Sequence, residues 1–292
     1  MTEILQIGGE RPDAGGRSRA RVIGVPEHFN LPWLKMADSG AITWRAVREG
    51  TGLMLEQLAA GQADIALLLT DGAVAGIANG APIRIIGCYV ESPLLWGVHV
   101  AASSALHTAE DLAGNRFAIS RYGSGSHLMA SIYAEDRRWS ESADQFVVVN
   151  TLDGARSALA RGDAEIFLWE KATTEPFVAN GEFRRIDEIP TPWPAFCACI
   201  PATADADAQR IANQLLHQAL TTAHQLKNAT GSIDEICRIF SLSRESVIDW
   251  LAATRWSATG TIDIDMLLAT ATRLHGAGVI QQMPARQVLK PD

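Results

Sequence analysis

Two segments of the sequence repeat each other, and this repeat constrains the fold more than any other feature. Residues 58–65 read LAAGQADI and residues 159–166 read LARGDAEI, and each follows a helical pattern. Gly61 and Gly162 suit the left-handed conformation that ends many helices. The apolar stretches that come next suit short, buried strands. The repeat therefore predicts two similar α/β lobes. The alternative is a chance match between two helix–glycine–strand junctions of the kind that many α/β proteins contain.

The rest of the chain alternates strand and helix patterns as such lobes require. Apolar runs predict strands at 21–28, near 42, 82–90, 94–102, 116–119, 146–150 and 195–200. Thr108 and Asp111 have the spacing of a helix cap, and helical periodicity dominates after the Pro-rich segment 189–201, to about residue 275. The segments 97–103 and 189–201 are the expected crossovers between the lobes, and two crossovers form a hinge.

Length, charge and cysteine usage exclude several classes of protein. The chain has 292 residues, is 47% hydrophobic and carries a net charge of −8, with its basic residues scattered, which argues against a nucleic-acid partner. No stretch approaches the roughly 18 apolar residues of a membrane helix, so no direct membrane insertion is expected. Cys88, Cys197, Cys199 and Cys237 lack zinc-site spacing, which predicts reduced thiols, no metal site and no cofactor.

The first 21 residues, MTEILQIGGERPDAGGRSRAR, contain no apolar core of signal-peptide length. Glu3, Glu10 and Asp13 also argue against a transit peptide. The sequence predicts a cytoplasmic protein, with a periplasmic location as the alternative if a leader has been removed. Residues 1–19 are expected to form a loose arm ahead of the fold.

Several segments, taken in order, resemble one family of proteins. They are VPEHFN (25–30), LAAGQADIALLLTDG (58–72), SPLLWGVHVAASSALHTAEDLAGNRFAIS (92–120), GSGSH (123–127) and ALARGDAEIFLWE (158–170), followed by a helical tail. Over about residues 20–290 the chain resembles the type 2 periplasmic substrate-binding proteins. Within that superfamily it is most similar to the binders of sulfonate, nitrate, taurine and thiamine pyrimidine, and to the thiamine-pyrimidine synthase-like proteins.

The resemblance implies an α/β fold of two lobes, each a mostly parallel sheet flanked by helices. Two crossovers would form the hinge, and a helical C-terminal tail would pack on lobe I. Lobe I would comprise residues 20–100 and 195–292, and lobe II would comprise residues 101–194. Proteins of this family hold a small molecule in the cleft between the lobes and deliver it to an ABC transporter, so a permease is a candidate partner. Because no leader is evident, the chain resembles a leaderless branch of the family.

The turn SRYGSGSH, residues 120–127, joins a predicted strand to a predicted helix. Such a turn leaves backbone N–H groups unpaired at the positive end of the helix dipole, and glycine lets a ligand approach the backbone closely. We expect an anion or carbonyl cradle here, with an ordinary helix cap as the alternative. The expected ligand contacts are Ser120, Arg121, Gly123, Ser124, Gly125, Ser126 and His127.

The segment VPEHFNLPW, residues 25–33, ends the first predicted strand, which faces the cleft in the expected fold. Glu27 and His28 are candidate ligand contacts because they would lie on a loop at that strand end. Phe29 and Trp33 are candidates for stacking on a planar ligand, with packing onto lobe I as the alternative.

The strand ends that follow the two repeats supply further candidates. Thr70 is expected to hydrogen-bond a ligand, and Asp71 either to do the same or to cap the next helix. Trp169 and Glu170 suit a ligand with a ring or an amine, with a salt-bridged loop as the alternative. Trp96, near the first crossover, is expected to wall the cleft.

Two functions of different classes follow from these residues. The first is a non-catalytic solute-binding protein of the ABC-transporter type, with a small anionic or heteroaromatic molecule in the cleft between the lobes. The alternative is a cytosolic enzyme on the same scaffold, with His28 as the general acid or base. The segment PEHFNLPW lacks the cysteine that sulfinate desulfinases of this fold carry in the early cleft loop, which favours the binding protein.

Overall fold

The computed structural model describes residues 6–7, 19–139 and 143–289, which form two compact units. Unit 1 comprises Met1–Ser92, Trp193–Ala271 and Gln282–Asp292, and unit 2 comprises Pro93–Pro192 and Thr272–Gln281. The first passage between the units was expected at 97–103 but lies at 92–93. The segment 272–281, expected in lobe I, groups with unit 2, where Arg273 forms an ion pair with Glu135.

Unit 1 is built on a mixed sheet with the strand order β1-β3-β2-β4-β9, rather than the mostly parallel sheet that was expected. Its strands are β1 (Gln6–Ile7), β2 (Ala20–Gly24), β3 (Ile42–Ala46), β4 (Ile65–Leu69) and part of β9 (Phe183–Pro201). β2 runs parallel to β3 and β4, whereas β1 and β9 pair antiparallel with their neighbours. The arm expected over residues 1–19 is therefore interrupted, because residues 6–7 pair with β3. Residues 1–5 and 8–18 of that arm lie outside the described residues.

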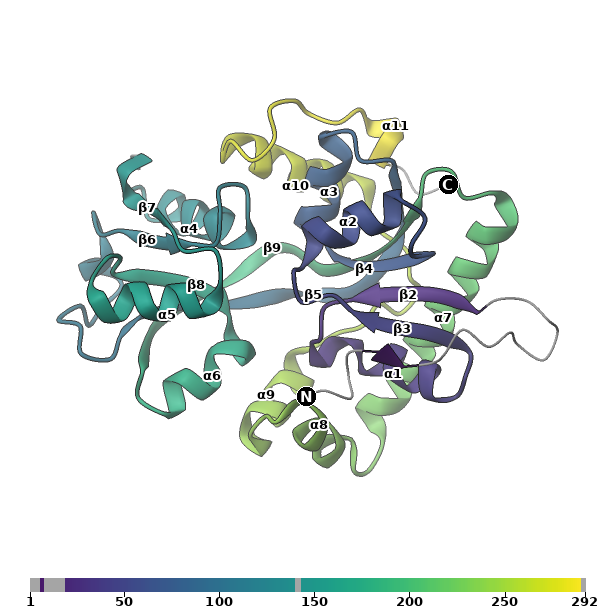
Figure 1. Cartoon of the computed structure of the whole chain (residues 1–292), viewed down its shortest axis with the longest axis horizontal. Helices are drawn as coiled ribbons and strands as arrows, with labels where there is room; N and C mark the ends of the chain where they lie inside the picture. The colour runs from purple at the N-terminus through teal and green to yellow at the C-terminus, as the bar shows by residue number, and fades with distance from the viewer. Residues whose placement is uncertain (1–5, 8–18, 140–142, 290–292) are drawn as a thin grey trace. The chain divides into compact units, whose positions relative to one another are not determined.

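Helices α1, α2 and α3 pack against this sheet, and further helices account for most of the C-terminal part of the chain (Figure 1). They are η1 (His28–Asn30), α1 (Leu31–Asp38), α2 (Thr51–Ala59), α3 (Thr70–Ala78), α7 (Ala206–Asn228), α8 (Ser232–Phe240), α9 (Arg244–Ala253), α10 (Ile264–Gly276) and α11 (Arg286–Leu289). α7 packs against α1, and Lys35 of α1 pairs with Glu235 of α8 at 2.7 Å. The helical tail up to Ala271 is thus part of unit 1.

Unit 2 repeats the same plan with the strand order β5-β8-β6-β7. Its elements are β5 (Ile83–Ala101, shared with unit 1), η2 (Glu110–Leu112), β6 (Phe117–Ile119), α4 (Gly125–Asp136), η3 (Ala143–Gln145), β7 (Phe146–Val148), α5 (Leu152–Arg161), β8 (Ile166–Glu170) and α6 (Lys171–Ala179). β6 is parallel to β7 and β8, and β5 is antiparallel to β8. Phe167 and Phe183 lie in its buried core, which α5 helps to enclose.

The sequence repeat is a structural repeat in the two units. Gly61 follows α2 with a φ of 66°, and Gly162 follows α5 with a φ of 73°, so both occupy the left-handed conformation. The N–H groups of Gly61 and Gly162 donate to the carbonyl oxygens of Leu58 and Leu159, at 3.1 and 3.2 Å. The α2–β4 and α5–β8 segments are therefore equivalent, and the predicted repeat of helix, glycine and strand is confirmed.

The same repeat carries an arginine–carboxylate pair in each unit, which the sequence prediction missed. Asp64 of the first repeat binds Arg21, with 2.7 Å between Oδ1 and Nη2. Glu165 of the second repeat binds Arg116 in the same way, with 2.6 Å between Oε1 and Nη2. Each carboxylate also accepts the backbone N–H of its arginine, so the pair fixes the start of a neighbouring strand in both units.

The predicted strand boundaries were wrong around both crossovers. The separate strands expected at 82–90 and 94–102 form one strand, β5, and the strand expected at 195–200 begins at Phe183, as part of β9. The prolines of these two strands lie outside the stretches that pair with β8 and β4, residues 96–99 and 196–199. A proline keeps an extended backbone, so both strands continue through the Pro-containing segments.

Candidate ligand-binding site

The predicted cradle lies at the end of β6, in unit 2, and leads directly into α4. Ser124 is the N-cap residue, with its Oγ accepting the N–H of His127, and Gly123 before it has a φ of 76°. Ser120, Ser124 and Ser126 are buried, whereas the side chain of Arg121 is exposed. The turn is thus a helix cap whose serines also form a buried polar cluster, and its role as a cradle for a ligand remains a prediction.

Each serine hydroxyl has one hydrogen to donate, and this fixes the direction of the hydrogen bonds among them. Ser124 Oγ donates to the carbonyl oxygen of Arg121 at 2.6 Å, so its 3.1 Å contact with Ser126 Oγ uses the Ser126 hydrogen. The 3.0 Å contact between Ser120 Oγ and Ser126 Oγ must then use the Ser120 hydrogen. We call the chain from Ser120 through Ser126 and Ser124 to the Arg121 carbonyl the serine relay.

The serine relay leaves no hydroxyl hydrogen free for a ligand in this arrangement. Ser126 Oγ also accepts the N–H of Ser120 at 2.9 Å, so its acceptor capacity is used within the turn. Ser120 Oγ heads the relay and accepts no hydrogen bond from any described residue. A ligand at this turn would therefore meet the first-turn N–H groups of α4 as donors and Ser120 Oγ as an acceptor.

His127 supports the turn from the first turn of α4. Its Nδ1 accepts the N–H of Gly123 at 3.2 Å, which requires the ring hydrogen on Nε2 when the imidazole is neutral. The ring packs edge-on against Phe146, with 4.7 Å between centroids, and burial lowers the pKa of His127. His127 is therefore a neutral part of the turn at neutral pH.

Trp96, Trp169 and Glu170 are brought together where β5 pairs with β8. Trp96 is paired in register with Glu170, and the rings of Trp96 and Trp169 meet edge-on at 6.3 Å between centroids. The Trp96 ring also borders the serine turn, because a Cβ added to Gly125 would lie 3.0 Å from it. Trp96 Nε1 is buried and has no hydrogen-bond partner among the described residues. In unit 2, Trp96 thus lies next to Trp169, Glu170 and the serine turn.

The Glu170 carboxylate is occupied locally as the N-cap of α6. It accepts the N–H groups of Ala172 and Thr173 at 3.0 and 2.7 Å, and the hydroxyl of Thr173 at 2.7 Å. Burial raises the pKa of Glu170, and these three donors oppose that shift. The alternative, a salt-bridged loop, is present through Lys171, which pairs with Glu188 at 2.7 Å.

In unit 1, the segment after β2 forms the short helix η1 instead of the expected loop. His28 and Phe29 are both 4% exposed, and their rings stack with 4.9 Å between centroids. Burial lowers the pKa of His28 to about 3, so the imidazole is neutral at neutral pH. Glu27 precedes η1 and is half-buried, whereas Trp33 is fully buried in α1, as the packing alternative requires.

Thr70 and Asp71 begin α3 at the end of β4, next to the end of β2 in the sheet. The predicted helix started after Asp71, but α3 starts at Thr70, so Asp71 lies in its first turn and is not the N-cap. Burial raises the pKa of Asp71 to about 6, against hydrogen bonds from the Trp193 indole and from the backbone of Asp71 and Gly72. The Thr70 hydroxyl is fully buried, and its polar neighbour is the Cys197 thiol.

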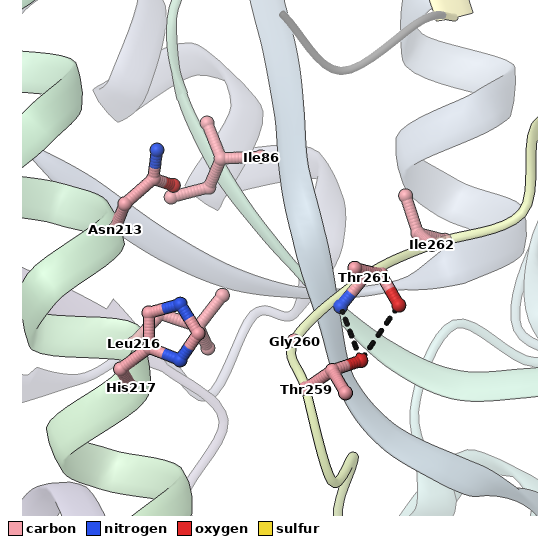
Figure 2. Close-up of a pocket in the computed structure, with 8 residues that line it drawn as sticks. All are labelled: Ile86, Asn213, Leu216, His217, Thr259, Gly260, Thr261 and Ile262. Carbon is pink, nitrogen blue, oxygen red and sulfur yellow. Dashed lines mark hydrogen bonds between the residues drawn. The ribbon is translucent and has the colours of Figure 1, made fainter.

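Unit 1 also contains a surface pocket of about 280 Å³ that involves none of the predicted residues. Figure 2 shows it between α7, which supplies Asn213 and His217, and the loop of Thr259 and Thr261. Thr259 Oγ1 is engaged by the hydroxyl and the N–H of Thr261, at 2.7 and 3.2 Å. Since the loop's polar groups bond to one another, we do not assign a ligand to this pocket.

Neither a metal-binding cluster nor a membrane-spanning helix is present in the described part of the chain. Residues 6–7, 19–139 and 143–289 contain no group of three or more His, Cys, Asp or Glu side chains that could hold a metal ion. Within the same residues, no helix combines the length and the apolar character needed to cross a membrane. The four cysteines are free thiols, and three of them are buried.

Comparison with known proteins identifies the fold. A profile of the family described as Ca3427-like PBP matches residues 96–189, nearly the whole of unit 2. The Candida albicans CA3427 gene product, which defines a family with the generic periplasmic binding protein fold, superposes with a TM-score of 0.81. It is 26% identical, over 90% of this chain and 91% of that one. The chain has the type 2 periplasmic-binding-protein fold.

Two bacterial proteins with the periplasmic-binding-protein fold are similar over nearly their whole length. The alkanesulfonate-binding protein SsuA from Xanthomonas axonopodis pv. citri, bound to MOPS, has a TM-score of 0.73 at 19% identity, covering 93% of this chain and 96% of that one. The periplasmic aliphatic sulphonate binding protein SsuA from Escherichia coli has a TM-score of 0.73 at 16% identity, covering 94% and 92%. No curated protein sequence matches the chain. The fold expected from the sequence is confirmed, and it is a fold of ligand-binding proteins.

Two residues beside the predicted ones were missed from the sequence. Trp250 of α9 lies edge-on against His28, with 4.2 Å between ring centroids, and Phe240 of α8 lies at 6.0 Å. They are more than 200 residues away along the chain, in a segment whose helical pattern predicted only packing. No spacing or motif in the sequence links them to His28.

Proposed function

We propose that this chain is a small-molecule binding protein of the ABC-transporter solute-binding type, with an anionic or heteroaromatic ligand. Following the family resemblance, the ligand would be held between the two lobes, with contacts from the strand ends of each. A transporter permease is the partner that this proposal implies. The experiment below addresses the ligand, on which the other parts of the proposal depend.

The observation that carries the proposal is the serine turn at the start of α4. Its hydroxyls are bonded to one another, so the turn is held in shape without a ligand. The N–H groups of Gly125 and Ser126 then lie at the positive end of the dipole of a twelve-residue helix. The ring of Trp96 borders the same turn, and its indole N–H is buried without a partner among the described residues. Preorganised backbone donors at a helix N-terminus suit a hydrogen-bond acceptor such as a carboxylate, a sulfonate or a carbonyl.

The aromatic side chains at the other strand ends support the heteroaromatic part of the proposal. Trp96 and Trp169 offer indole surface in unit 2, and His28 and Phe29 offer stacked rings in unit 1. Flat rings of this kind bind planar molecules at a low entropic cost. A ligand with a ring and an acceptor group would use both kinds of contact.

The geometry gives little support to the enzymatic alternative. A general acid or base works best with a pKa near the working pH, whereas burial lowers the pKa of His28 to about 3. Its ring is enclosed by other rings, and no carboxylate or hydroxyl of the described residues bonds to it and orients it. We therefore keep the binding protein as the single proposal.

Mass spectrometry of freshly purified protein, first native and then denatured, tests the proposal. We expect a complex heavier than the chain that releases one small molecule of defined mass on denaturation. Ser126→Ala interrupts the serine relay and should weaken binding of that molecule by about 1–3 kcal/mol. Ser157→Ala is the matched control, because Ser157 is an exposed serine of the same unit. Equal affinity for the two variants would show that the serine turn does not bind the ligand.

A further inference from the structure

The sheet of unit 2 ends in β7, which pairs with a described strand on one side only (Figure 1). It runs parallel to β6, with Phe146 beside Phe117 and Val148 beside Ile119. The N–H of Val149 donates to the Ile119 carbonyl at 2.8 Å. Because successive residues of a strand direct their backbone groups to opposite sides, the N–H of Val148 and the carbonyl of Phe146 are directed to the open edge.

The side chains along this open edge are apolar and partly exposed to solvent. Val148 is 45% exposed, and Tyr122, which follows β6, is 56% exposed. Phe146 is half-buried, and its ring centroid lies 6.2 Å from that of Tyr122. From Phe146 to Val149 the edge carries neither a charged residue nor a proline, which are common means of preventing an edge strand from pairing. The edge is therefore suited to pairing with another strand.

The two ends of the open edge carry opposite charges. Asp144 lies just before β7 and is exposed. Arg121 is also exposed and lies beside the other end, where the N–H of Asn150 donates to the carbonyl of Ser120 at 3.0 Å. Neither Asp144 nor Arg121 forms an ion pair with another described residue. Antiparallel strands bring the start of one strand to the end of the other, so this edge complements the charges of a second copy of itself.

We propose that the open edge of β7 is the interface of a homodimer, in which the β7 strands of two copies pair antiparallel and join their unit 2 sheets. A two-fold axis beside Val147 places Val148 of each copy opposite Phe146 of the other. Each Val148 N–H then donates to the Phe146 carbonyl of the second copy, and the two side chains form an aromatic–β-branched pair of the kind that stabilises sheets. Asp144 of each copy comes level with Arg121 of the other. This interface goes beyond the proposed binding function and does not depend on it.

The self-complementarity of the edge is the reason for choosing a second copy as its occupant. An interface with two-fold symmetry uses the same surface on both subunits, so each feature of that surface must find its complement on the same surface. Here a donor meets an acceptor, an apolar side chain meets an apolar one, and an acid meets a base. In a parallel arrangement Asp144 would face Asp144 and Arg121 would face Arg121, so the charges select the antiparallel one.

Sedimentation equilibrium of the full chain tests the dimer, and the wild type should show a reversible equilibrium between monomer and dimer. Val148→Lys places a charge on the open edge and should raise the dissociation constant of the dimer by about tenfold or more. Ile248→Lys is the matched control, because Ile248 of α9 is 44% exposed, and it should dimerise as the wild type does. A monomeric wild type, which would leave an extended segment of another protein as the occupant, or equal effects of the two variants would overturn the proposal.

A charge reversal tests the antiparallel arrangement. Asp144→Arg places a guanidinium opposite Arg121 of the second copy and should weaken the dimer about three- to tenfold, and Arg121→Asp should do the same. The double variant Asp144→Arg/Arg121→Asp should dimerise nearly as well as the wild type, because the pair is reversed rather than removed. A double variant that dimerises no better than the single variants would contradict the antiparallel pairing.

Hydrogen exchange measured by mass spectrometry locates the interface. The segment 144–150 should exchange its amide hydrogens more slowly at concentrations where the wild type is dimeric than where it is monomeric. In Val148→Lys the rate should not depend on concentration. Unchanged exchange of this segment in a dimeric sample would place the interface elsewhere and overturn the proposal.

Discussion

The serine turn of unit 2 and the ring cluster of His28, Phe29, Phe240 and Trp250 in unit 1 both lie where a parallel strand ends, yet they are built in opposite ways. We call this ring cluster the His28 cage. The serine turn uses residues 120–127 alone, and its hydroxyls are all engaged in the relay. The His28 cage joins residues from η1, α8 and α9, is entirely aromatic, and leaves two buried polar atoms unpaired.

The hydrogen bonds of the serine turn are complete, whereas two polar atoms of the His28 cage have no hydrogen bond with a described residue. The serine turn needs no ligand to complete its hydrogen bonds, so it should have the same shape with and without one. The His28 cage leaves His28 Nε2 and Trp250 Nε1 without a hydrogen bond among the described residues, so it is held by ring packing and burial.

Removal of a cage ring should be far more damaging than removal of the exposed ring of the serine turn. Phe29 is 4% exposed and packs on Phe196 at 5.3 Å, so Phe29→Ala should lower the free energy of unfolding by about 3–5 kcal/mol. Tyr122 is 56% exposed, and Tyr122→Ala should change it by less than about 0.5 kcal/mol. Urea unfolding of both variants measures the difference, and similar values would break the contrast.

Acid should destabilise the His28 cage because its imidazole is buried in the neutral form. The folded pKa of His28 is about 3 and the ordinary value is 6.5, so between these values the unfolded chain binds a proton that the folded chain does not. The stability contribution is present above pH 6.5 and is lost as the pH falls toward 3, by up to about 1.4 kcal/mol per pH unit.

Urea unfolding between pH 7 and 5 tests this sign with His28→Phe as the comparison. The wild type should lose about 2 kcal/mol more than the variant over that range. His99 of unit 2, whose pKa burial lowers to about 4, is present in both proteins and cancels in the comparison. Parallel pH curves for the two proteins would show that His28 is not buried in the neutral form.

The direction of the serine relay predicts unequal effects for two similar substitutions. Ser126→Ala removes two hydrogen bonds that Ser126 Oγ accepts and one that it donates, and it leaves the N–H of Ser120 without a partner. It should therefore lower the free energy of unfolding by about 1–3 kcal/mol. Ser120→Ala removes only the first bond of the relay and should cost about 1 kcal/mol. Thermal or urea unfolding ranks them, and the reverse order would refute the relay.

The smallest effect is expected where the serine turn meets Trp96. A Cβ at Gly125 would lie 3.0 and 3.2 Å from two ring atoms of Trp96, so Gly125→Ala should lower the free energy of unfolding by about 1 kcal/mol. Gly276→Ala is the control, because no atom lies near its added Cβ, and it should be neutral or raise that energy by up to about 1 kcal/mol. A stabilising Gly125→Ala would mean that Trp96 moves freely.

Local patterns in the sequence correctly predicted the elements that depend on neighbouring residues. Gly61 and Gly162 end their helices in the left-handed conformation, and Thr108 and Asp111 form the expected reciprocal hydrogen bonds at the start of η2. The expected strand-to-helix turn at 120–127 is present. The strand boundaries expected at 90–94 and at 195 were wrong, because β5 and β9 continue through these positions and an extended backbone accommodates proline.

The repeated α/β units, their caps and the serine turn could be predicted from the sequence, because these rest on contacts between residues a few positions apart. The pairing of Asp71 with Trp193 and of Trp250 with His28 could be seen only in the folded structure. Those pairings depend on which side chains meet after the helices pack, and burial then determines their charge. Hydrophobic patterning predicts that a helix packs, but not which ring of that helix meets a histidine more than 200 residues away.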